Sequence, residues 1–265
     1  TVQRVVSILT METSGIFGTI LGTAAKQIFV FMIFGSFLEL SGASEFFLKM
    51  TSTMLGSLKG SGAKVNTMAG GLLGMVSGSA VANVMAVGPM TFPMMKKDGF
   101  SKDFCGAIAA ISGAGGQLMP PVMGTAAFII AETLAVSYGE VTKAALIPGV
   151  LFYLTIWITI NCHSNHLGLK ERKEKADWIP VVKNGFYYLV PIIFLIVTIS
   201  VLKWSPIKAG LWSTVLVVAV SQFNKDNRMT LKIVIRAMEN SAKGALTVSV
   251  ACAVAGIIVG ILSIT

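Results

Sequence analysis

Residues 70–123 constrain the fold most, because they carry two polar breaks inside otherwise apolar, membrane-like sequence. The first break is a Ser-Gly-Ser cluster at residues 77–79, and the second is a glycine-rich run at residues 112–121 that ends in two prolines. Lipid offers no partner to an unpaired backbone amide or carbonyl, so broken helices are tolerated at membrane depth only where protein or a polar cavity surrounds them. Paired breaks of this kind indicate a transport site.

The composition supports a membrane setting. Of the 265 residues, 54% are hydrophobic and only 12% are charged, whereas ordinary soluble domains are about 25% charged. The mean hydropathy is +0.77. A net charge of +9 fits nucleic acid, an anionic membrane surface or membrane topology; in a chain this apolar we favour topology and expect no nucleic-acid partner. We therefore predict an all-α integral membrane protein, a bundle of several spanning helices in contact with lipid.

The first break predicts a re-entrant hairpin. Residues 65–78 are too short to cross a bilayer, and so are residues 79–95 once Pro89 and Pro93 interrupt them. The hairpin is predicted to have its tip at residues 77–79, where glycine permits a tight reversal and the serine hydroxyls cap the second half-helix.

The second break predicts a discontinuous transmembrane helix. Residues 104–111 form its first half and residues 118–136 its second, on either side of the break at residues 113–116. Pro120 and Pro121 fall near the restart, where the first turn of a helix tolerates proline.

The remaining apolar segments predict ordinary spanning helices at residues 24–40, 144–162, 186–202 and 210–223. Residues 44–59 have an amphipathic pattern, which fits an interfacial helix or a packed connector equally well. Two loops rich in Lys and Arg, at residues 163–177 and 225–236, are separated by two predicted spans. The positive-inside rule places both loops in the cytoplasm.

The last residues repeat the spacing of the first hairpin. Gly256, Gly260 and Ser263 match the separations of Gly70, Gly74 and Ser77, which predicts an internal repeat. The chain starts without Met and stops inside an apolar run, so we expect a fragment of a longer protein. The predicted domains are an N-terminal scaffold and interfacial helix (1–64), a first transport half with hairpin and broken helix (65–142), scaffold helices with basic loops (143–243) and the start of a second repeat (244–265).

Three stretches together carry a resemblance to a known family. These are residues 74–84 (GMVSGSAVANV), 115–124 (GGQLMPPVMG) and 255–260 (AGIIVG). They resemble the large membrane subunit of TRAP transporters (DctM-like), within which the chain is most similar to the fused permeases of the TAXI-type subgroup. The resemblance covers nearly the whole chain.

The resemblance implies an elevator-type secondary transporter built from two inverted repeats and driven by sodium as the coupling ion, with no other cofactor. It also implies a multi-pass protein of the bacterial or archaeal inner (plasma) membrane. The expected partners are a periplasmic solute-binding protein, a small-subunit transmembrane region, fused or separate, and a small organic solute, for which we predict a carboxylate.

Nine residues at the two breaks are predicted to contact the ion or the substrate: Ser77, Gly78, Ser79, Asn83, Ser112, Gly113, Gly116, Gln117 and Pro120. Unwound carbonyls and Ser or Asn side chains supply a sodium ion with oxygens without a full charge, and helix N-termini at the same breaks favour a carboxylate. Alternatively, the hydroxyls and Asn83 cap helix ends or bond across helices, and the glycines allow close helix packing.

Other polar residues point less clearly to function. Glu132 lies in an apolar segment and is predicted to sit near the membrane edge rather than to bind a proton or ion. His163 and His166 are predicted to lie in a solvated loop, and Cys105, Cys162 and Cys252 to be packed thiols. No metal site other than one for sodium is expected.

Functions of other classes remain open. A membrane enzyme needs a GxSxG serine or an HExxH pair, and the sequence has neither motif. Glycine-rich breaks also build the selectivity filters of ion channels. Another elevator-type anion/sodium symporter, or a scaffold piece of a larger permease, are the further alternatives.

Overall fold

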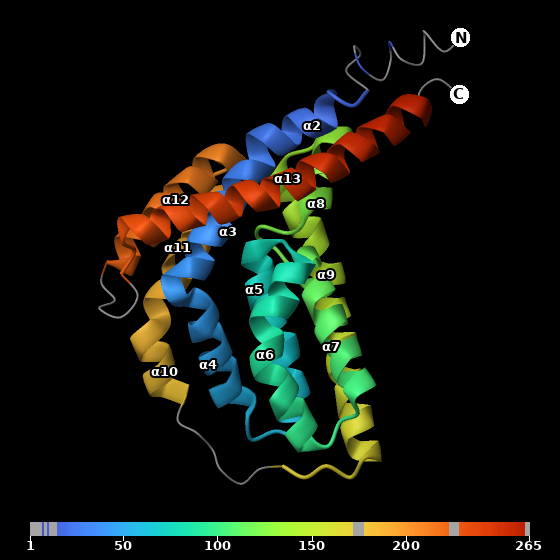
Figure 1. Cartoon of the computed structure of the whole chain (residues 1–265), viewed down its shortest axis with the longest axis vertical. Coiled ribbons are helices and arrows are strands. Elements are labelled where there is room, and N and C mark those ends of the chain that lie inside the picture. Colours follow the sequence, from blue (N-terminus) through green and yellow to red (C-terminus); the bar gives the residue numbers. More distant parts are fainter. Residues whose placement is uncertain (1–6, 8–9, 11–14, 172–177, 223–227, 263–265) are drawn as a thin grey trace.

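The computed structural model describes residues 7, 10, 15–171, 178–222 and 228–262, and every regular element in these ranges is helical (Figure 1). The elements in chain order are α2 (Thr19–Thr23), η1 (Ala24–Ile28), α3 (Phe29–Leu38), η2 (Glu39–Ala43), α4 (Ser44–Leu55), α5 (Ser61–Ser77), α6 (Ala80–Asp98), α7 (Lys102–Gly115), η3 (Gly116–Leu118), α8 (Thr125–Thr133), α9 (Tyr138–His166), α10 (Trp178–Gly185), η4 (Phe186–Tyr188), α11 (Leu189–Ser200), α12 (Pro206–Ser221) and α13 (Leu231–Leu262). The predicted all-helical class is confirmed.

Three helical runs in the described ranges are long and apolar enough to cross a membrane. They are Thr19–Leu55, which joins α2 to α4, and the helices α9 and α13. The spanning helices predicted at residues 186–202 and 210–223 appear as shorter apolar helices, Phe186–Ser200 and Pro206–Ser221. At about 1.5 Å per residue they fall short of the roughly 30 Å hydrocarbon core.

The Thr19–Leu55 run bends at Gly42, whose φ of 96° lies in a region that favours glycine. Beyond the bend, α4 packs against α5 and α10, with Phe46 and Phe47 buried. The ring of Phe46 lies 5.6 Å from that of Tyr188. This packing favours the connector over the interfacial helix for residues 44–59.

The hairpin is formed by α5 and α6, which run antiparallel and meet at the predicted tip (Figure 1). Gly78 ends α5 with φ 61°, and the Ser79 hydroxyl caps α6 by accepting a hydrogen bond from the Ala82 amide at 3.3 Å. The expected interruption of α6 is wrong, because the helix continues through Pro89 and Pro93 to Asp98. Both prolines are exposed.

The second break is confirmed, but it lies later than predicted. Helix α7 continues through residues 112–115, the 3-10 helix η3 follows at Gly116–Leu118, and residues 119–124 link it to α8, which begins at Thr125. Pro120 and Pro121 therefore lie in the linker and not in the first turn of the second half-helix. Among the small residues at 113–116, Gly113 and Gly116 pack closely against the hairpin, whereas Gly115 packs against Phe152 of α9.

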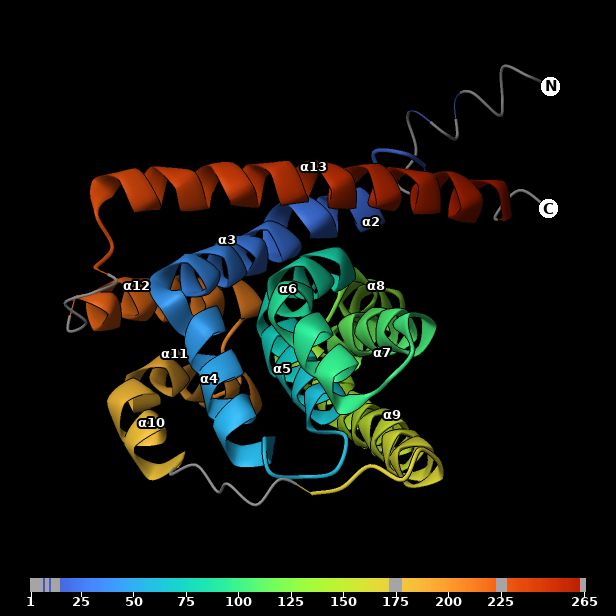
Figure 2. The same ribbon diagram turned by 60° about the horizontal axis from the view of Figure 1, so that its bottom comes forward.

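The C-terminal part also differs from expectation. Helix α13 begins at Leu231, so Lys232 and Arg236 belong to a helix and not to a basic loop. The long α13 lies along α2 and α3 (Figure 2), and Gly256 packs against the backbone of Gly15. Ser263, the last member of the predicted repeat, lies outside the described residues, as do Arg172, Lys173, Lys175 and Lys225 of the basic loops.

Candidate functional site

The hairpin tip and the helix break meet at two glycines. A Cβ on Gly74 would overlap the Cα of Gly116, and a Cβ on Gly116 would lie 2.5 Å from the Cα of Gly74. Gly113 is similarly close to α6, since a Cβ there would lie 3.0 Å from the carbonyl oxygen of Ala80. These glycines therefore allow close helix packing, which was the alternative to a binding role. This packing brings the backbone of the break directly against the hairpin.

Asn83 joins the tip to the break. Its side chain is 1% exposed, its Oδ1 accepts a hydrogen bond from Ser77 Oγ at 2.7 Å, and its Nδ2 donates to the Gly113 carbonyl at 3.3 Å. Ser77 Oγ also accepts from the Ser79 amide at 3.2 Å. A buried amide needs such partners because water does not reach it.

Gln117 makes a second link across the same gap. Its Nε2 donates to the Gly78 carbonyl at 3.2 Å, 39 residues away in the chain. The backbone adds a third link, from the Val122 amide to the Met75 carbonyl at 3.1 Å. Met123 lies so close to Gly78 that a Cβ on this glycine would overlap the Met123 carbonyl oxygen.

Two helix N-termini converge there. Helix α6 begins beside Gly78, and α8 begins at Thr125 after an N-cap glycine, Gly124, that offers no side-chain cap. The backbone amides at a helix N-terminus carry a partial positive charge. The arrangement therefore combines oxygen ligands from Ser77, Gly78, Asn83 and Gly113 with an electropositive backbone, which suits a small cation and a carboxylate together.

The structure does not bring all nine predicted residues to this point. Ser112 faces the body of the hairpin, where its Oγ accepts a hydrogen bond from Asn66 Nδ2 at 2.6 Å. Pro120 is half-buried in the linker, and the carbonyl of the following Pro121 accepts from the Tyr138 hydroxyl at 2.8 Å. Of the other seven, five make contacts between the hairpin and the break, namely Gly78, Asn83, Gly113, Gly116 and Gln117. Ser77 and Ser79 bond within the hairpin tip.

Sequence reasoning missed the buried partners of Ser112. Asn66 is 2% exposed and Thr91 is fully buried, and the Thr91 hydroxyl lies 2.7 Å from Asn66 Oδ1. Tyr153 in α9 donates to the Ser112 carbonyl at 3.0 Å. The side-chain amide of Asn66, in a segment of mostly small residues, could have been noticed in the sequence. Its partners Thr91 and Ser112, however, lie 25 and 46 residues away.

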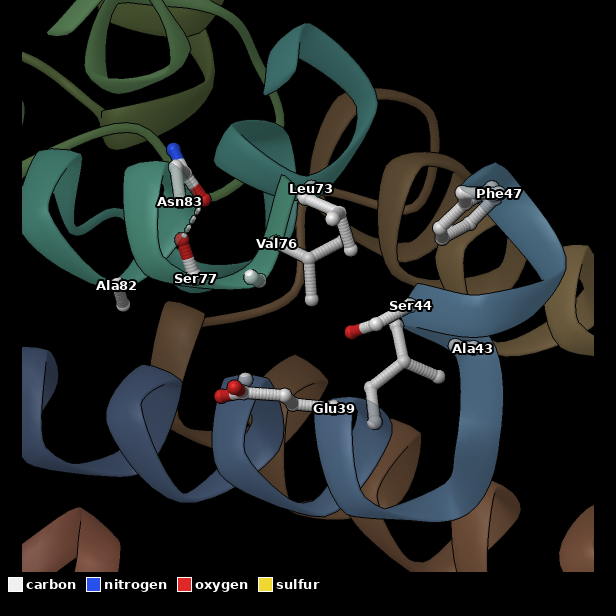
Figure 3. A pocket seen from close by; sticks show the side chains of 12 residues that line it. Glu39, Ala43, Ser44, Phe47, Leu73, Val76, Ser77, Ala82 and Asn83 are labelled. Atoms are coloured by element: carbon white, nitrogen blue, oxygen red, sulfur yellow. Dashed lines mark hydrogen bonds between the residues drawn. The ribbon is translucent and has the colours of Figure 1, made fainter. Parts of the chain in front are cut away.

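A small cavity separates the tip from the bend of the Thr19–Leu55 run (Figure 3). Ser77 and Asn83 line one side, and Glu39 and Ser44 line the other. The cavity offers about 10 Å³ to the centre of a water molecule, enough for roughly one water. The Ser44 hydroxyl is buried and has no hydrogen-bond partner among the described residues.

A larger open cavity of about 640 Å³ lies at the end of the bundle where α9 and α12 begin. It is lined by charged residues of both signs, namely Glu132, Glu140, Lys143 and Lys203, beside Trp204. Glu140 is engaged in the cap of α9, where its carboxylate accepts from the Ser137 amide at 3.3 Å. Exposed Glu132 lies in the last turn of α8; its position near the membrane edge stays a prediction.

The histidines and one cysteine depart from the predictions. His163 and His166 lie in the last turn of α9, not in a loop, and the ring of His163 stacks on Phe104 at 4.2 Å. Within the described ranges no group of three or more His, Cys, Asp or Glu residues is placed to hold a metal ion. Cys105 and Cys252 are buried free thiols as predicted, whereas Cys162 is exposed because it lies on the outer face of α9.

Comparison with known proteins gives a consistent relationship. A family model described as "Tripartite ATP-independent periplasmic transporter, DctM component" matches residues 2–265. The C4-dicarboxylate TRAP transporter large permease protein DctM of Rhodobacter capsulatus is 28% identical over 229 residues, which are 80% of this chain and 51% of the relative.

Two further relatives carry other solute names. The isethionate TRAP transporter permease protein DctMQ of Oleidesulfovibrio alaskensis is 30% identical over 170 residues, 62% of this chain and 26% of the relative. The sialic acid TRAP transporter large permease protein SiaM of Vibrio cholerae is 25% identical over 183 residues, 68% of this chain and 42% of the relative. The chain thus spans between about a quarter and a half of the length of these relatives.

Proposed function

Because the chain belongs to the DctM component family of tripartite ATP-independent periplasmic (TRAP) transporters, we propose that it forms part of a permease that takes up a small organic carboxylate with sodium. The family consists of transporter components, as the sequence resemblance predicted, and is not a family of enzymes. The solute is delivered by a periplasmic binding protein, and a small-subunit transmembrane region, fused or separate, completes the permease.

The observation that carries this proposal is the junction of hairpin tip and helix break. Asn83 and Gln117 tie the two breaks together through Gly113 and Gly78, and the N-termini of α6 and α8 open onto the same place. Oxygens without a full charge suit sodium, and the partial positive charge of the helix N-termini suits a carboxylate. Ser77, Gly78, Ser79, Asn83, Gly113, Gly116 and Gln117 form this half of the transport site.

The nature of the relatives' solutes supports a carboxylate or a similar anion. C4-dicarboxylates, sialic acid and isethionate appear in their names, and each carries an acidic group. The finer assignments are also part of the proposal: a fused permease of the TAXI-type subgroup, two inverted repeats, elevator-type movement and a location in the bacterial or archaeal inner membrane. The chain is then a fragment that holds the first transport half, and the second half of the site belongs to the rest of the permease.

The geometry of the hairpin supports a re-entrant position. The bases of α5 and α6 lie at the end of the bundle where α9 ends (Figure 1). Helix α5 has 17 residues, whereas α9 has 29. At about 1.5 Å per residue the tip then stands partway along α9, near the middle of the bilayer.

Membrane orientation gives one testable prediction. Lys170 follows the end of α9, and Lys203 lies beside its beginning, between α11 and α12. In a cysteine-free full-length permease, Lys170→Cys is expected to react with a membrane-impermeant maleimide only in inside-out vesicles. Lys203→Cys is expected to react only from the outer face of intact spheroplasts, because the positive-inside rule places the loop after α9 in the cytoplasm. Labelling of both residues from the same side contradicts this topology.

Uptake by the full-length permease tests the proposed function. Proteoliposomes with the cognate binding protein are expected to accumulate a carboxylate solute only under an inward sodium gradient, with saturation, and a neutral analogue is expected not to compete. Passive, non-saturable flux identifies a channel instead. Uptake that is independent of the hairpin, for example unchanged by Ser79→Ala, points to a scaffold role for this part of the chain.

A further inference from the structure

Asn66 ties three helices together deep inside the hairpin. It lies in α5 and is 2% exposed. Its Nδ2 donates to Ser112 Oγ in α7 at 2.6 Å, and its Oδ1 accepts from Thr91 Oγ1 in α6 at 2.7 Å. Asn66 precedes Ser77 by eleven residues, which is about 16 Å along the helix at about 1.5 Å per residue.

Asn83 repeats this arrangement at the tip. It too accepts from one arm of the hairpin, through Ser77, and donates to α7, at the Gly113 carbonyl. Gly113 directly follows Ser112. The two buried asparagines therefore contact adjacent residues of α7, Asn66 from α5 and Asn83 from α6.

The contact of α7 with the hairpin is specific because the facing surfaces are small. Gly70 faces Ser112, where a Cβ would lie 3.4 Å from the Ser112 Cβ, and Gly74 faces Gly116. Surfaces without bulky side chains let the helix backbones approach closely, but this packing does not by itself pair the buried polar groups. Directional hydrogen bonds between buried groups fix one position, since any other leaves an amide or hydroxyl unpaired.

Ser112 links the position of Asn66 in α5 to the position of α7. Its hydroxyl donates to the Ile108 carbonyl at 2.5 Å while it accepts from Asn66, and its own carbonyl accepts from Tyr153. The hydroxyl and the carbonyl of Ser112 thus have defined partners on α5, α7 and α9.

We propose that Asn66, held by Thr91, is a positioning residue of the transport site. It sets the register of α7 against the hairpin and thereby places the Gly113 carbonyl against Asn83, without contacting ion or solute itself. The inference rests on the proposed function in assigning the ion to the tip, whereas the coupling of Asn66 to the tip geometry is independent of what the tip binds.

Two near-isosteric substitutions in the full-length permease test this role. Thr91→Val removes the hydroxyl that holds Asn66, and Thr67→Val is the matched control. Thr67 is equally buried, and its hydroxyl bonds the Ala63 carbonyl within α5 at 2.9 Å. In hydrogen-exchange mass spectrometry, Thr91→Val is expected to speed amide exchange at residues 77–84 and 112–117 by about tenfold, and Thr67→Val to leave it unchanged.

Transport assays measure the sodium concentration for half-maximal uptake, which a purely structural role of Asn66 would not change. Thr91→Val is expected to raise the sodium concentration for half-maximal uptake about fivefold to tenfold at a nearly unchanged maximal rate, and Thr67→Val to leave both unchanged. Ser112→Ala breaks the Asn66 bond from the α7 side and is expected to reproduce the Thr91→Val pattern, including when Thr91→Val folds poorly.

Equal exchange rates at the tip in Thr91→Val, Ser112→Ala and Thr67→Val overturn the inference. So does faster exchange at the tip with an unaltered sodium requirement. Failure of the proposed function looks different, because wild-type uptake then ignores sodium while the exchange experiment still reports whether Asn66 positions the tip.

Discussion

Replacing Gly74 by alanine is expected to abolish solute uptake and to lower the melting temperature of the full-length permease. A Cβ at this position would overlap the Cα of Gly116 and lie 2.7 Å from Asn83 Nδ2. Neither the Gly116 backbone nor the buried Asn83 amide can move aside without a large energetic cost. Helix α5 and the helix break must therefore separate. Overpacking of this kind costs about 1–3 kcal/mol, and separation also breaks the bond from Asn83 to Gly113.

Gly106→Ala is the matched control for this prediction. Gly106 also lies in a helix, α7, but a Cβ there would meet nothing within 4 Å. Alanine is expected to leave uptake unchanged and to stabilise the helix by up to about 1 kcal/mol. A Gly74→Ala permease that melts and transports like the Gly106→Ala variant contradicts the close contact at the tip.

Asn83→Ala is expected to reduce sodium-driven uptake at least tenfold while the protein still folds. The substitution leaves Ser77 Oγ and the Gly113 carbonyl without their buried partner, and each unpaired group costs about 1–3 kcal/mol. It also removes an oxygen from the proposed ion site, so the sodium concentration for half-maximal uptake rises. The measurement is uptake against sodium concentration in proteoliposomes, together with the melting temperature of the purified permease.

Asn165→Ala controls for the loss of an amide as such. Asn165 is exposed in the last turn of α9, far along the chain from both breaks, and its replacement is expected to change neither uptake nor sodium dependence. Unaltered sodium dependence in Asn83→Ala, with a melting temperature below that of wild type, makes Asn83 a structural cap and removes it from the proposed site.

The tip of the hairpin could be predicted from the sequence because neighbouring residues alone determine the reversal. A Ser-Gly-Ser cluster in an apolar run supplies the left-handed glycine and the capping hydroxyl that a sharp reversal needs, and Gly78 and Ser79 adopt these roles. The break after α7 was readable for the same reason. Its exact place was not predicted, because the surroundings of residues 113–116 come from the hairpin and from α9, which lie far away in the sequence.

Features that depend on tertiary contacts were predicted poorly. Prolines predict an interruption of α6, yet the helix continues through both, and both are exposed. Lys232 and Arg236 suggest a loop, but they form the first turns of α13. Nothing in the sequence pairs Asn66 with Ser112, since the amide and the hydroxyl are 46 residues apart. The second repeat and the domain limits stay predictions.

The uninterrupted course of α6 has a consequence for its surroundings. Proline has no N–H, so the carbonyls of Met85 and Pro89, four residues before Pro89 and Pro93 respectively, lose the i to i+4 hydrogen bond that this N–H would donate. Met85 and Pro89 are both exposed residues. In hydrocarbon an unpaired carbonyl costs several kcal/mol, whereas water, a neighbouring polypeptide segment or a local shift of the helical hydrogen bonds satisfies it. Around its two prolines, α6 is therefore expected to meet water or protein more favourably than acyl chains.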